Sequence, residues 1–151
     1  MNTNLSNLEK KGSLKITEEQ HSQIHGEIQE LLRQFCHVKA NNEISINYEC
    51  FKRVNIFIEK SLILNYLIYT IETVLKSYDT FTVHANIKKV TLLEIDKNKD
   101  FIFEMSNILK TRFNDKLDLC FIYEGSFIFK QIYNLLSTFI DKSTMNKIRF
   151  S

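Results

Sequence analysis

Histidine and cysteine side chains are the first candidates for chemistry in this sequence. His21 and His25 are four residues apart in a helical pattern, so both rings lie on one face, and with Cys36 or His37 they could ligate zinc. The spacing lacks the glutamate of an HExxH motif, so surface histidines are the simpler interpretation. Adjacent helix residues do not face each other, so Cys36 and His37 make a poor nucleophile–base pair. We expect no metal site and no cofactor.

A second group of candidates surrounds the end of an apolar run. Residues 117–123 (LDLCFIY) predict a buried strand, and Glu124-Gly125-Ser126 predicts a tight corner in which Ser126 caps the next helix. Open α/β sheets bind ligands at the carboxyl ends of parallel strands, often beside a helix N-terminus. The candidate residues for contact with a ligand or a partner are His84, Tyr123, Glu124, Ser126, Phe127 and Phe129.

Simpler interpretations of these residues stay open. Glu124 and Ser126 could form only a capped corner, and the aromatic side chains around them could belong to the core. A carboxylate without a second carboxylate or a base nearby gives little support for catalysis. We therefore expect a protein that is not an enzyme.

Composition excludes several classes of protein. With three glycines and no proline in 151 residues, neither GxGxxG nor GxxxxGK[ST] can be written. A net charge of +2 from interspersed charges gives no basic stripe for nucleic acid. Three widely spaced cysteines indicate reduced thiols and an intracellular protein. The apolar run 62–71 is far shorter than the ~20 residues of a membrane span, so we expect a soluble protein or one peripheral to a membrane.

The elements that position the candidates follow from apolar periodicity. Residues 1–15 predict a flexible arm, and 16–151 predict a single domain. The expected helices cover 17 to about 36–39, 61–77, 101–113 and 127–140, and the expected strands cover 44–46, 54–58, 81–86, 117–123 and 145–150. Gly26 inside the first helix suggests a close approach by a neighbouring element. This alternation predicts an α/β fold with a mixed, mostly parallel sheet flanked by helices.

The second half of the sequence resembles the CRAL-TRIO lipid-binding domain family. Residues 117–150 have the strand, corner, aromatic-rich helix, Phe-Ile-Asp-Lys and Lys-Ile pattern of that family. Residues 62–87 resemble its first crossover helix and second strand, and 99–117 its next helix. The segment LNYLIYTIE at 64–72 most resembles the BCH branch of the family. Two departures are His84-Ala85-Asn86-Ile87 in place of Asp-Leu-Lys-Gly, and Glu124-Gly125-Ser126 in place of Asn-Ala-Pro.

The resemblance implies a shortened CRAL-TRIO-like lobe with an N-terminal helix. It also implies that a complete domain continues beyond Ser151 with elements that close over the lipid. A shallow pocket would leave acyl chains in water at a cost of ~0.8 kcal/mol per CH2. We therefore expect a non-enzymatic protein-interaction module, either a structural or accessory subunit of a larger assembly or a homodimer, with small-GTPase contact as a special case. The alternative is a small lipid- or hydrophobic-ligand-binding protein at a membrane surface.

Overall fold

Within residues 18–125 and 128–151, which the computed structural model describes, five strands form one sheet in the order β1-β2-β3-β4-β5. Strand β1 (Cys36–Ala40) pairs with β2 (Glu43–Asn47) in antiparallel orientation. Strands β3 (Phe81–Asn86), β4 (Leu117–Tyr123) and β5 (Ile148–Phe150) continue the sheet in parallel. The predicted α/β class with a mixed, mostly parallel sheet is confirmed.

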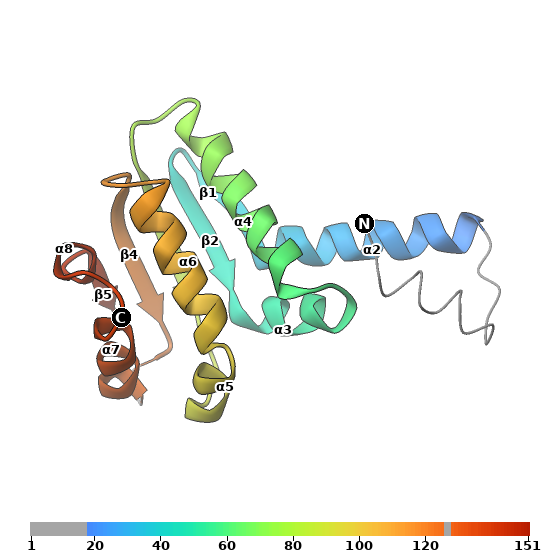
Figure 1. The fold of residues 1–151 in the computed structure, drawn as a ribbon. Helices are drawn as coiled ribbons and strands as arrows, with labels where there is room; N and C mark the ends of the chain where they lie inside the picture. Colours follow the sequence, from blue (N-terminus) through green and yellow to red (C-terminus); the bar gives the residue numbers. More distant parts are fainter. Residues whose placement is uncertain (1–17, 126–127) are drawn as a thin grey trace.

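Helices connect the parallel strands, and one further long helix precedes the first strand (Figure 1). The helices are α2 (Glu18–Phe35), α3 (Tyr48–Phe57), α4 (Lys60–Leu75), α5 (Leu92–Lys97), α6 (Lys99–Thr111), α7 (Phe129–Ser137) and α8 (Lys142–Met145). In Figure 1, α4 and α6 cross in front of the sheet, while α2 projects away from its edge. In the described part of the chain, none of these helices is both long and apolar enough to cross a membrane.

Helix α4 forms the centre of the larger hydrophobic core. Its buried side chains recur every three or four residues, and they include Ile63, Leu67, Ile71 and Val74. This spacing directs one helix face onto the sheet, where Phe81 of β3 is fully buried. A smaller cluster joins Ile122 and Ile148 to α7 and α8, so the fold has core packing at both ends of the sheet.

The predicted strand at 54–58 is wrong, because residues 54–57 belong to helix α3 and Ile58 is its C-cap. Asn47 caps the helix by accepting a hydrogen bond from the backbone N–H of Cys50 at 3.1 Å. Val54 and Ile58 are both buried, at 0% and 6% exposure, whereas Ile56 is 73% exposed. Positions 54 and 58 share a face in a helix as well as in a strand, so the alternation alone did not distinguish the two.

The first predicted helix ends earlier than expected, because residues 36–39 belong to β1. Helix α2 ends at Phe35, and β1 and β2 form a hairpin that turns at Asn41, whose φ is 53°. Asparagine tolerates this left-handed conformation better than most residues. The close approach suggested at Gly26 is not observed, because in the described part of the chain no atom of a neighbouring element lies within 4 Å of a Cβ built there.

The last two predicted elements are shorter than expected. Helix α7 spans Phe129–Ser137 rather than 127–140, and β5 spans Ile148–Phe150 rather than 145–150. Asp141 does not end a long helix but caps α8, since its side chain accepts hydrogen bonds from Thr144. The proposed cap Ser126 and the expected arm at 1–15 lie outside the described residues.

Candidate functional site

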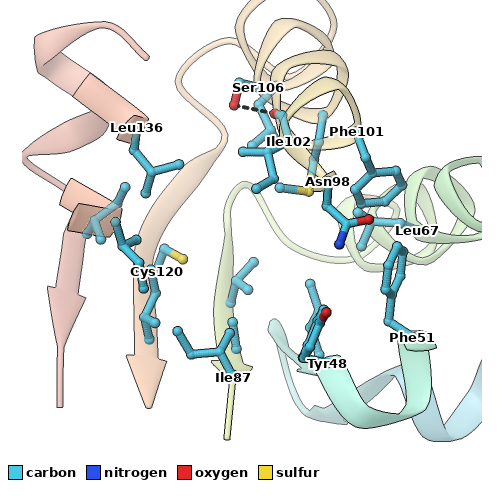
Figure 2. A pocket seen from close by; sticks show the side chains of 18 of the residues that line it. Tyr48, Phe51, Leu67, Ile87, Asn98, Phe101, Ile102, Ser106, Cys120 and Leu136 are labelled. Atoms are coloured by element: carbon cyan, nitrogen blue, oxygen red, sulfur yellow. Dashed lines mark hydrogen bonds between the residues drawn. The ribbon is translucent and has the colours of Figure 1, made fainter. Parts of the chain in front are cut away.

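An apolar cavity of about 250 Å³ lies between the sheet and the helices that cover it (Figure 2). Alternate residues of the parallel strands form its floor, namely Val83 and Ala85 of β3 with Cys120 and Ile122 of β4. Helices α4, α6 and α7 supply the opposite wall, with Leu67, Ile71, Phe101, Ile102, Met105, Leu109, Ile132 and Leu136. These three helices therefore cover the same face of the sheet.

Local sequence explains why these side chains converge. In β3, every second residue faces the cavity, so Val83 and Ala85 face it while His84 lies on the other face. In α6, Ile102, Met105 and Leu109 recur at three- and four-residue spacing and form one apolar stripe. Ala85 has only a methyl group, so the middle of the floor contributes little volume to the packing.

Polar side chains gather at one end of the cavity, beside the start of α3 and the α5–α6 corner. Tyr48 Oη donates a hydrogen bond to Glu94 Oε2 at 2.5 Å. Thr91 and Glu94 form a capping box at the start of α5, with the Thr91 N–H and hydroxyl donating to Glu94 Oε1. Asn98 donates from Nδ2 to the Glu94 backbone carbonyl at 2.9 Å, and its side chain lies between Phe101 and Tyr48 in Figure 2.

The charge at this polar end is negative. The hydrogen bond from Tyr48 lowers the pKa of Glu94 below its usual value, with help from Thr91 and Lys52 and against the effect of burial. Burial and the neighbouring Glu94 carboxylate raise the pKa of Tyr48, so its hydroxyl stays protonated. Among the described lining residues Glu94 is the single carboxylate, and none is Lys, Arg or His.

The cavity also contains a thiol that the sequence placed in the core. Burial raises the pKa of Cys120 to about 12, and it raises the pKa of Cys36 to about 12 as well. A thiolate is the reactive form of cysteine, so neither side chain is activated as a nucleophile. Within the described residues no three His, Cys, Asp or Glu side chains converge as metal ligands.

Two of the predicted site residues meet on the opposite face of the sheet. His84 Nδ1 and Tyr123 Oη are 2.7 Å apart, and His84 Nε2 lies 2.7 Å from Glu43 Oε1. Phe121 stacks on His84 with ring centroids 5.2 Å apart, because the two residues are partners in the β3–β4 register. The group joins three strands, but it does not line the cavity.

The remaining predicted site residues are dispersed. Glu124 follows β4 in an exposed corner with a φ of 65°. Phe129 on α7 is 43% exposed and packs edge-on against Phe150, with the two ring centroids 4.5 Å apart. Ser126 and Phe127 lie outside the described residues. A role in binding for all six residues stays a prediction.

Sequence reasoning missed the polar end of the cavity and the carboxylate beside His84. The sequence Thr91-Leu92-Leu93-Glu94 matches the capping-box motif and could have indicated the polar end of the cavity. Glu43 pairs with Thr82 across the β2–β3 ladder, two residues before the Ser45–His84 pair. That proximity depends on the strand register, which no motif in the sequence specifies.

Together these features define an α/β protein with an apolar cavity between a mixed sheet and its covering helices. A family model described as the CRAL/TRIO domain matches residues 41–151, and the chain belongs to that family. Members of this family usually bind lipids or other small hydrophobic ligands.

A solved structure shows the same fold. The crystal structure of Sfh5 is similar with a TM-score of 0.64 and 18% sequence identity, over 77% of this chain and 47% of that chain. This chain therefore spans about half the length of the Sfh5 chain. Among curated proteins, none matches the sequence.

Proposed function

We propose that the chain binds a lipid or another small hydrophobic ligand in the cavity between the sheet and helices α4, α6 and α7. The observation that carries this proposal is the cavity itself, about 250 Å³ in volume with walls that are almost entirely apolar. Protein interiors are close-packed and contain few voids larger than a water molecule. A void of this size gives up packing energy that a ligand would restore.

The lining explains why water is a poor occupant. A buried water needs two to four polar partners, whereas the floor offers Val83, Ala85 and Ile122. An engineered apolar cavity of roughly 150 Å³ stays dry and binds benzene. A larger apolar cavity therefore favours a hydrocarbon-like ligand.

The test is titration of the full chain with naphthalene, which has no polar group. Isoleucine methyl resonances report the site: Ile102 and Ile132 line the cavity, and the 73% exposed Ile56 is the matched control. We expect saturable shifts at the two cavity methyls and none at the control. Mass spectrometry of organic extracts from protein purified from its native source would identify the natural ligand. Absence of saturable shifts, together with clean extracts, contradicts the proposal.

A protein-interaction role is a second candidate, which the face opposite the cavity favours. There the side chains of His84, Phe121 and Tyr123 stack as a half-buried aromatic row. A subunit of an assembly, a homodimer, or the small-GTPase contact suggested by the BCH-like wording would each cover such a surface. Light scattering coupled to size exclusion tests the protein-interaction role, because a stable monomer that retains no partner in affinity purification contradicts this role.

Under either proposal, we infer that the chain acts without catalysis.

A further inference from the structure

The polar end of the cavity brings charged side chains of α3 and α5 together. Lys52 Nζ lies 3.4 Å from Glu94 Oε2 and 3.9 Å from Glu49 Oε1, so one ammonium group faces two carboxylates. This cluster therefore has a net negative charge. Glu94 lines the cavity whereas Lys52 does not, so a ligand at this end meets the carboxylate.

Asn98 adds a hydrogen-bond acceptor at the same end. The Glu94 backbone carbonyl can only accept, so its 2.9 Å contact identifies the side-chain nitrogen of Asn98. Among the described residues no hydrogen bond to Asn98 Oδ1 is present, and Figure 2 shows this oxygen on the side of Phe101 while the nitrogen points toward Tyr48. Tyr48 directs its own proton to Glu94. A ligand head that donates a hydrogen bond fits this end, and an anionic head does not.

The volume limits the length of the ligand. Scaling from roughly 150 Å³ for the six carbons of benzene, a cavity of about 250 Å³ accommodates about ten carbon atoms. A single medium-length chain satisfies this limit, whereas two long acyl chains exceed it.

We propose that the cavity selects an uncharged, single-chain alcohol of about ten carbons over the carboxylate of the same length. This inference rests on the proposed function and specifies its ligand class. The alcohol donates to Asn98, while the carboxylate is repelled by Glu94 and finds no cationic side chain among the described lining residues.

The test compares decan-1-ol with decanoate on the full chain at neutral pH, by calorimetry and by the shifts of the Ile102 and Ile132 methyls. We expect decan-1-ol to bind at least about tenfold more tightly, because like charges brought together across an interface are strongly unfavourable. Equal binding, or tighter binding of decanoate, overturns the inference. Saturable naphthalene binding in the same protein would then show that the cavity still takes hydrophobic ligands.

Variants separate the role of the carboxylate from the effects of chain length. Glu94→Gln should strengthen decanoate binding and bring the preference below about threefold. The matched control is Glu104→Gln, since Glu104 is exposed on α6 and does not line the cavity. A preference that Glu94→Gln leaves unchanged would assign the selectivity to another group and refute this role of Glu94. Failure of naphthalene and both ten-carbon ligands would refute the proposed function as well.

Discussion

Replacing Ala85 with leucine tests whether the space above the sheet is real. Ala85 lies in β3, in the floor of the cavity, and is half-buried. Leucine adds three carbons, which would project between the sheet and the covering helices. In a close-packed core such a substitution is destabilising by typically about 1–3 kcal/mol. In a cavity of about 250 Å³, the added carbons have room.

The expected magnitude follows from the transfer of these carbons out of water and into the cavity. At ~0.8 kcal/mol per buried CH2, three carbons stabilise the unliganded protein by at most ~2.4 kcal/mol. Imperfect fit reduces the gain, so we expect the free energy of unfolding to rise by about 1–2 kcal/mol. The same carbons displace about three of the roughly ten that a ligand could place there. Binding of decan-1-ol should weaken by up to ~50-fold, since ~1.4 kcal/mol corresponds to tenfold.

Urea denaturation and calorimetric titration measure the two effects on the same sample. The matched control is Ala40→Leu, because Ala40 is an exposed residue of β1 at the edge of the sheet. Exposed substitutions of this kind usually change stability by less than about 0.5 kcal/mol, and ligand affinity should stay the same. Higher stability with lower affinity, at position 85 alone, is the signature of a filled binding cavity.

A loss of more than about 1 kcal/mol in Ala85→Leu would refute this reasoning, if Ala40→Leu stays neutral. It would show that the sheet and helices are already close-packed at this position. Unchanged ligand affinity in a stabilised variant would be equally damaging, because the ligand would then occupy a different site.

Three further predictions concern Glu94 and the helices. Tyr48→Phe removes the largest cause of the lowered pKa of Glu94, so an NMR titration should place that pKa closer to its usual value of ~4.3. A carboxyl group whose pKa is lowered in the folded state stabilises the folded protein at pH values above its unfolded-state pKa. The difference in unfolding free energy between the wild type and Tyr48→Phe that is due to Glu94 should therefore shrink as the pH falls through the folded-state pKa. Gly26→Ala should stabilise by about 0.5–1 kcal/mol in urea melts, since among the described residues a Cβ there meets no atom of another element within 4 Å, and glycine is a poor helix former. Asn47→Ala should cost ~1 kcal/mol by the same assay, through loss of the cap on Cys50, whereas Asn47→Asp should cost much less.

Strand positions were predictable where alternation and composition agreed. The run LDLCFIY predicted β4 with its observed bounds, and the alternation of Phe81, Val83 and Ala85 predicted β3. Both strands are short and rich in apolar and aromatic residues, and both are flanked by turn residues. Strand β2 was predicted at 44–46, but β1 was missed because Cys36 and His37 continue the pattern of α2 without a helix-stop signal until Asn41.

The cavity could not be predicted from the sequence. Its walls join Ala85, Ile102 and Ile132, which lie on separate elements, and its volume depends on how far the helices stand from the sheet. Apolar periodicity indicates which side faces the core but not whether the core is full. The apolar stripe of α6 would look the same over a packed interior.

The alternation of side chains along a strand explains why the polar site residues predicted on β3 and β4 do not line the cavity. In β3, His84 is the residue with recognisable chemistry, and its neighbour Ala85 has none. Successive strand residues point to opposite faces of the sheet. The polar residue His84 therefore marks the face opposite the one that helices α4, α6 and α7 cover. His84 and Tyr123 accordingly meet on that face, while the cavity on the other face is built from residues assigned to the core. The side chains at the polar end of the cavity lie near the starts of the connecting helices. Tyr48 and Glu94 hold those positions here, at the starts of α3 and α5.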